Sequence, residues 1–205
     1  FMLHGQGLAT GLEPQLALGT SLASILFTSL SSVRAHHRHG AVEWSLVRRI
    51  APGIVVGTLV GAVLAAQVSA FALKLFFVAF LFYAAVQMWL DFKPAPHREL
   101  PGRAGTLLAV GVIGAVSSWV GIGGGTLSVP FMLWHNITLH RAIATSSAIG
   151  FPIAVAGAVG YVLGGWQVGG LPEGSLGFVY LPALSGIVLG SVLTAPLGAR
   201  TAHRL

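Results

Sequence analysis

The chain has 205 residues, of which 55% are hydrophobic and only 8% are charged. Soluble domains carry about 25% charged residues, so this composition is typical of an integral membrane protein. The net charge of +6 comes from basic residues in the segments between apolar stretches, which argues against a nucleic-acid-binding surface. The chain has no cysteine, which excludes disulfides, thiolate metal sites and catalysis by a thiol.

Six stretches of the chain are apolar over the length of about 17–25 residues that a helix needs to cross a bilayer. Five of them contain no charged residue, and the third contains only Lys74. In chain order they are 15–33, 50–66, 71–90, 104–134, 142–166 and 175–199. The sequence therefore predicts an all-α, polytopic helical protein in the lipid bilayer.

Lysine and arginine are concentrated in the loops at alternate ends of these stretches. The segments with basic residues are 34–49, 91–103, 135–141 and 200–205, whereas 1–14, 67–70 and 167–174 contain no Lys or Arg. Because cytoplasmic loops carry an excess of basic residues, we expect the four basic segments to be cytoplasmic. Lys74 is expected near the outer end of its helix, where its ammonium group reaches the interface.

The stretch 104–134 has basic residues at both ends, Arg103 and Arg141, so a single crossing does not fit the charge pattern. Its sequence WVGIGGGTLSVP (119–130) contains a cluster of glycines, and glycine costs about 1 kcal/mol relative to alanine inside a helix. We therefore predict a broken helical hairpin, in which one helix stops at these glycines and a shorter segment returns. One tilted crossing is the alternative.

Two parts of the chain resemble each other in sequence. LALGTSLASI (16–25) matches RAIATSSAIG (141–150), and PGIVVGTLVGAVLA (52–65) matches SGIVLGSVLTAPLG (185–198). The predicted directions of the matching helices are opposite, which indicates inverted repeats, as in many secondary transporters. We predict one repeat over 1–100 and another over 101–205, with a glycine-broken hairpin in each. The first repeat's broken helix is expected before Phe1, and the second repeat's last helix after Leu205.

The glycine block and its neighbours resemble the sulfite exporter TauE/SafE family of anion permeases. The resemblance is carried by GIGGGTLSVPFML (121–133) and ATSSAIGFPIAVAGAVGY (144–161), with first-half counterparts at 17–44 and 51–62. It implies a multi-pass protein of the bacterial inner membrane that transports sulfite, sulfonates or related sulfur oxyanions. Export of sulfite or a small organosulfonate by alternating access is the leading interpretation, and uptake of a sulfonate or thiosulfate is the alternative.

The helix break is the predicted binding site for this anion. Helix N-termini present unpaired N–H groups and about half a positive charge, and transporters place such ends near the membrane midplane. The residues that we expect to supply backbone donors are Gly121, Gly123, Gly124, Gly125 and Thr126. Close helix packing is the alternative role for these glycines.

Hydroxyl groups at the starts of two helices are further candidates for the site. They belong to Thr20, Ser21, Thr145, Ser146 and Ser147, and each could donate to an oxyanion. The alternative is a hydroxyl that donates to a carbonyl of its own helix, as is common in membrane helices. By contrast, Gly53, Gly57 and Gly61 have the spacing of a helix-packing contact.

Other functions have little support in the sequence. The six stretches contain no His, Asp or Glu, so we expect no enzyme and no catalytic residue, since hydrolysis needs a base or a metal. The histidines of RAHHRHG (34–40) fit a cytoplasmic loop better than a metal site, and no cofactor is expected. A non-transporting membrane scaffold is the alternative from another class. The sequence leaves open the substrate among sulfur oxyanions, the coupling ion and assembly into a homo-oligomer.

Overall fold

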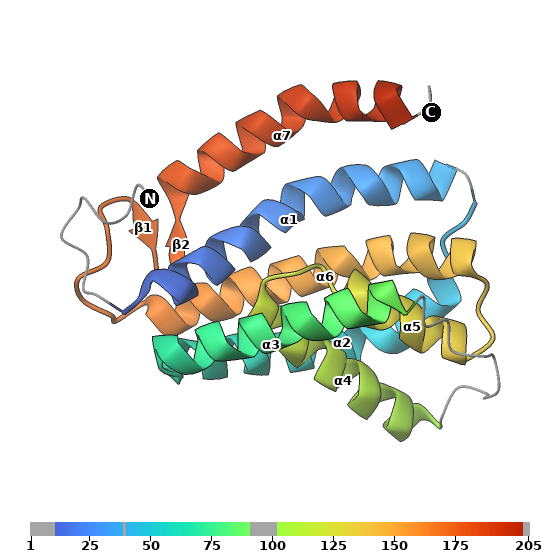
Figure 1. The fold of residues 1–205 in the computed structure, drawn as a ribbon, viewed down its shortest axis with the longest axis horizontal. Coiled ribbons are helices and arrows are strands. Elements are labelled where there is room, and N and C mark those ends of the chain that lie inside the picture. Colours follow the sequence, from blue (N-terminus) through green and yellow to red (C-terminus); the bar gives the residue numbers. More distant parts are fainter. Residues whose placement is uncertain (1–10, 39, 91–101, 203–205) are drawn as a thin grey trace.

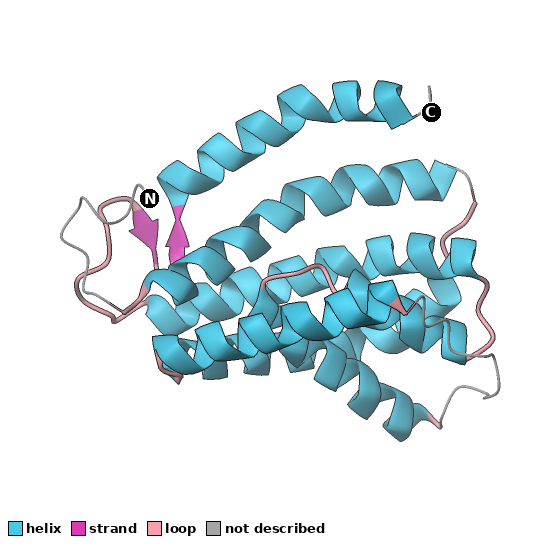
Figure 2. Ribbon diagram, viewed as in Figure 1, coloured by secondary structure: helices cyan, strands magenta, loops and turns pink. Residues whose placement is uncertain are grey.

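The structure is a computed structural model that describes residues 11–38, 40–90 and 102–202, which form helices and one short hairpin of strands (Figures 1 and 2). The elements are α1 (Glu13–Arg38), α2 (Trp44–Gln67), α3 (Ala70–Trp89), α4 (Arg103–Val120), α5 (Gly125–Trp134), α6 (Leu139–Gly165), β1 (Ser175–Leu176), β2 (Val179–Tyr180) and α7 (Leu181–Ala202). Among the described residues, α1, α2, α3, α4 and α6 are long and apolar enough to cross a membrane. The predicted helical membrane fold is confirmed.

One predicted helix starts later than expected. Residues 175–180 form an antiparallel hairpin in which Ser175 pairs with Tyr180 and Leu176 with Val179, and α7 begins only at Leu181. Gly177 turns the chain with φ +54, a left-handed conformation that glycine adopts readily. The prediction of a helix across 175–180 was therefore wrong, because these apolar residues have the composition of the helix that follows.

The predicted helix break lies at the glycines. Gly121 has φ +72, and both its N–H and that of Ile122 donate to Ser117 O, at 2.9 and 3.1 Å, which is a common way to end a helix. Gly124, with φ +79, immediately precedes α5. In Figure 1, α4 runs into the bundle and α5 returns toward the end from which α4 started. The broken hairpin is confirmed in this part of the chain.

The core of the bundle is built around α6. This helix packs along α1 and α2, and α2 also packs along α4. Helices α1 and α6 run in opposite directions, as do α2 and α7 (Figure 1). These directions are the ones that inverted repeats require, while the repeat itself and its boundaries at 1–100 and 101–205 stay predictions. The expected first broken helix lies outside the described residues.

Glycines allow α2 and α4 to approach closely. A Cβ atom added at Gly53 would lie 2.7 Å from Leu107 O, and one added at Gly61 would lie 2.6 Å from the Cα of Ala115. A Cβ at Gly57 would overlap the backbone of Gly111. The prediction that these three glycines form a helix contact is confirmed.

The two ends of the bundle differ in charge. At one end α1, α3 and α5 finish and α2, α4 and α6 begin (Figure 1); we call it the basic end. Its first and last helical turns contain Arg34, Arg48, Arg103 and Arg141. At the other end lies the hairpin 175–180, so we call it the hairpin end. The assignment of the basic end to the cytoplasm stays a prediction.

Candidate functional site

A polar cleft opens beside the helix break. It has a volume of about 360 Å³ and lies between the break, α1 and α6. Its lining residues are Ile25, Thr28, Ser29, Ser32, Gly123, Gly125, Ser146, Ser147 and Gly150. No charged side chain is among these residues, so a charged ligand here must be held by backbone groups and hydroxyls.

The break supplies the unused hydrogen-bond donors of this cleft. In the described part of the chain, the backbone N–H groups of Gly123, Gly124, Gly125 and Thr126 form no hydrogen bond, whereas those of Leu127 and Ser128 donate to Gly124 O. The first N–H groups of a helix have no partner within it, and the helix dipole adds a partial positive charge at the same place. This combination is the usual backbone device for binding an anion.

Glycine keeps the approach to these donors open. A Cβ atom added at Gly123 would meet only Ile25 Cγ2 at 3.7 Å and the Cα of Gly150 at 3.9 Å. A Cβ added at Gly150 would lie 3.5 Å from Gly123 O. The break therefore passes α6 with a glycine on each side, and free space is left beside Gly123.

Four of the hydroxyl groups that line the cleft already have partners. Ser147 donates to Ile143 O at 3.1 Å, and Thr28 and Ser29 donate to carbonyls of α1 at 3.3 Å. The Ser146 hydroxyl is paired with that of Ser128 at 2.9 Å. The hydroxyls of Ser147, Thr28 and Ser29 would have to rotate away from their acceptors before donating to a ligand, whereas the unbonded backbone N–H groups need no such rearrangement.

The predicted site residues fall into three groups. Gly123, Gly125, Ser146 and Ser147 line the cleft, whereas Gly124 and Thr126 are their neighbours in the chain and are not among the lining residues. Gly121 and Ser21 fasten the break to α1, because the Ser21 hydroxyl donates to Gly121 O at 2.8 Å. Thr20 and Thr145 lie elsewhere: each accepts a backbone N–H from another element, Thr20 from Tyr180 at 3.0 Å and Thr145 from Glu43 at 3.1 Å.

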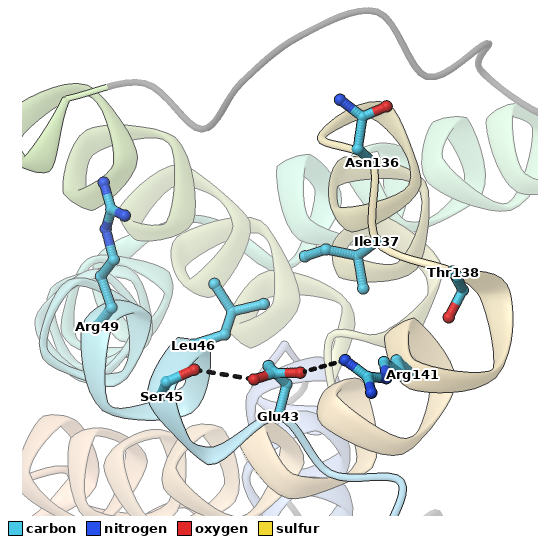
Figure 3. Close-up of a pocket in the computed structure, with 8 residues that line it drawn as sticks. All are labelled: Glu43, Ser45, Leu46, Arg49, Asn136, Ile137, Thr138 and Arg141. Carbon is cyan, nitrogen blue, oxygen red and sulfur yellow. Dashed lines mark hydrogen bonds and ion pairs between the residues drawn. The ribbon is translucent and has the colours of Figure 1, made fainter.

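Thr145 belongs to a contact between the loop before α2 and the start of α6 at the basic end. Figure 3 shows Glu43 between Ser45 and Arg141, with hydrogen bonds of 3.0 Å to each. These residues line a second pocket of about 370 Å³, in which Arg49 points away from Glu43. None of the predicted site residues lines this pocket, and Arg141, one of its two arginines, is already paired with Glu43.

Replacing Thr145 with valine should lower stability and leave substrate affinity unchanged. The substitution removes the acceptor of the Glu43 N–H next to a fully buried position, and an unsatisfied buried donor costs about 1–3 kcal/mol. Thermal unfolding in detergent and equilibrium binding of sulfite would measure the two effects. Thr138→Val is the matched control, because this exposed threonine makes no capping bond. A large loss of sulfite affinity together with normal stability would show instead that Thr145 takes part in binding the substrate.

The hydroxyl groups that α1 contributes to the cleft were not predicted from the sequence. Thr28, Ser29 and Ser32 lie on one stripe of the helix, since residues three or four apart share a face, and Ser29 is buried. A polar stripe inside a charge-free span was the available indication. One of the histidines of 34–40 has a structural partner: Trp44 Nε1 donates to His37 Nδ1 at 3.1 Å, while His39 lies outside the described residues.

Comparison with known proteins agrees with this architecture. The sequence profile of the family described as "Sulfite exporter TauE/SafE" matches residues 5–205. The chain belongs to this family. A "Probable membrane transporter protein" of Haemophilus influenzae is 32% identical over 191 residues, which cover 92% of this chain and 72% of that protein. The "Probable membrane transporter protein YdhB" of Bacillus subtilis is 26% identical over 90% of this chain and 73% of its own length. No solved structure matches significantly.

The family and these relatives indicate that this TauE/SafE protein is a multi-pass membrane transporter. The glycine-rich block at 121–125 and the helix 139–165 both lie inside the matched region. The cleft between them is therefore the candidate site of transport.

Proposed function

We propose that this TauE/SafE protein exports sulfite or a small organosulfonate across the bacterial inner membrane, by alternating access around the cleft at the helix break. The observation that carries the proposal is the row of unbonded N–H groups from Gly123 to Thr126, at the N-terminus of α5 and beside a cleft lined by hydroxyls. The basic end faces the cytoplasm in this proposal, in line with the positive-inside rule.

The chemistry of the cleft favours an oxyanion over a cation or an apolar ligand. N–H groups donate and cannot accept, and the partial charge at a helix N-terminus is positive. A Lys or Arg in the cleft would bind an anion more tightly but would also hinder its release, and the lining has neither. Donors without a fixed charge suit a site that must bind and release at each cycle.

The driving force in this proposal is the membrane potential. None of the residues that line the cleft is Asp, Glu or His, so the described residues offer no carrier for a coupled proton at the site. A potential that is negative inside favours the exit of an anion by about 2.3 kcal/mol per charge per 100 mV. The proposed export of the anion is therefore driven by the membrane potential and needs no proton gradient.

Sulfite flux through the purified protein in proteoliposomes tests this function. The expected result is sulfite release that follows an imposed potential and that is unchanged by a pH gradient. Empty liposomes provide the control for leakage of sulfur dioxide through the lipid. Release that needs a pH gradient would contradict the potential-driven mechanism.

The same experiment separates the alternatives. Flux of taurine-like sulfonates or thiosulfate in place of sulfite would keep the site and change the substrate, and flux only into the vesicles would favour an uptake permease. If sulfite, sulfonates and thiosulfate are all inert while the protein is folded, transport of sulfur oxyanions is wrong and a non-transporting scaffold becomes the better interpretation.

A further inference from the structure

The hairpin 175–180 is inserted between α1 and α6 at the hairpin end of the bundle. Each of its strands has two residues, Ser175–Leu176 and Val179–Tyr180, with Gly177 and Phe178 at the turn. Phe178 has no exposed surface, and Val179 is 3% exposed. The tip of this small element is therefore buried in the helix bundle rather than lying on it.

Glycines of α1 and α6 form the surface against which the turn of the hairpin packs. A Cβ atom added at Gly19 of α1 would lie 3.0 Å from the carbonyl carbon of Phe178, and one added at Gly165 of α6 would lie 2.9 Å from the Cα of Gly177. Gly177 in turn contacts the backbone of Val162. Contacts this close leave no space for a side chain at these positions, so the shapes of the hairpin and the two helices are complementary.

Two hydrogen bonds fasten the hairpin, one to each helix. The Phe178 N–H donates to Tyr161 O of α6 at 3.2 Å, and the Tyr180 N–H donates to the Thr20 hydroxyl oxygen of α1 at 3.0 Å. The hairpin thus bridges the same two helices that form the walls of the cleft. Ser29 lies about 13 Å from Thr20 along α1, at 1.5 Å per residue, on the side toward the basic end.

We propose that the hairpin 175–180 is the gate of the transport pathway at the hairpin end, with Phe178 as its plug and Thr20 as the residue that latches it. This inference rests on alternating access at the cleft, as proposed above. In the position seen here, the hairpin closes the space between α1 and α6 at the hairpin end, and the cleft lies toward the basic end. Transport to the other side then requires the hairpin to withdraw, which a two-residue strand pair held by two outward hydrogen bonds can do without unfolding a helix.

The absence of cysteine from the chain allows the gate to be tested by thiol labelling. A Ser147→Cys variant reports access to the cleft, and Leu176→Cys, which is exposed at the hairpin, reports which membrane face carries the hairpin. A membrane-impermeant maleimide is added at that face. We expect Ser147→Cys to be labelled about two- to tenfold faster when Thr20→Val is also present, because one hydrogen bond that holds the gate is lost.

Thr194→Val is the matched control, since the Thr194 hydroxyl only donates to Gly190 O of its own helix, and it should leave the labelling rate unchanged. Phe178→Ala should raise the rate further if the protein still folds; where it does not, Thr20→Val decides. Equal labelling rates with and without Thr20→Val, in protein with a normal elution profile, would overturn the gate. Labelling does not depend on the substrate, so this outcome is independent of the sulfite experiment.

A reversible cross-link provides the opposite test. The 3.0 Å contact between Tyr180 N and the Thr20 hydroxyl limits the separation of the two Cα atoms to about 7 Å, at the upper end of the range of about 4.4–6.8 Å that a disulfide spans. The double variant Thr20→Cys/Tyr180→Cys should transport when reduced, stop when oxidised and recover with a reductant, while Tyr180→Cys alone should not respond. Undiminished transport after complete cross-linking would overturn the gate. No transport in the reduced variant and in the wild-type protein would instead count against the proposed function.

Discussion

Replacing Gly123 with alanine is expected to lower sulfite transport about tenfold or more without reducing the amount of folded protein. Gly123 lines the cleft, and the added methyl group would occupy free space there, since the nearest atoms are 3.7 Å away or more. Hydrogen bonds to a charged ligand contribute about 1.5–3 kcal/mol each, and about 1.4 kcal/mol corresponds to a factor of ten. The initial rate of flux in proteoliposomes, normalised to reconstituted protein, measures the effect.

Gly186→Ala is the control for this experiment. It lies in α7, and a Cβ atom there would meet nothing within 4 Å, so transport and folding should both be normal. Gly124→Ala is a poorer probe of binding, because Gly124 has φ +79 and its Cβ would lie 2.5 Å from Ile153 Cδ1. Wild-type transport by Gly123→Ala would mean that the break does not face the substrate.

Replacing Gly57 with alanine is expected to destabilise the bundle. The new Cβ atom would lie 2.6 Å from the Cα of Gly111, so α2 and α4 would have to separate along their tightest contact. Extra atoms in a packed interior cost about 1–3 kcal/mol. For a protein of this size we expect the melting temperature to fall by roughly 3–10 °C, which thermal unfolding in detergent followed by tryptophan fluorescence would measure.

The partner glycine in this contact gives a matched control. A Cβ atom at Gly111 would lie 3.5 Å from Gly53 O, an ordinary contact, so Gly111→Ala should leave the melting temperature nearly unchanged. Equal melting temperatures for the two variants would show that the packing of α2 on α4 is looser than the structure indicates.

The sequence was sufficient to predict the helices and the break, because both depend on local chemistry. Long apolar spans without charge are typical of membrane helices, and a cluster of glycines such as Gly121, Gly123, Gly124 and Gly125 strongly disfavours a continuous helix. The hairpin could not be predicted in this way. Its residues SLGFVY (175–180) are as apolar as a helix of this protein, and only contacts with α1 and α6, far away in the sequence, give them a different structure.

The site was predicted in part for a similar reason. Clustered glycines favour a break over the G-x-x-x-G spacing of helix packing, so Gly123 and Gly125, which line the cleft, could be proposed as site residues from the sequence. A hydroxyl can donate to a ligand or accept from the protein, and the sequence does not distinguish these uses. Thr20 and Thr145 match in the predicted repeats, yet each accepts an N–H from a neighbouring element. Their shared position in the repeats therefore does not place them in the cleft.

The central claim is that the N-terminus of α5 holds the transported oxyanion. Equilibrium binding of radiolabelled sulfite to the purified protein tests it most directly, in the wild type, Gly123→Ala and Gly186→Ala. The account predicts saturable binding that Gly123→Ala weakens about tenfold or more and that Gly186→Ala leaves intact. Equal affinity of the wild type and Gly123→Ala for sulfite would contradict it.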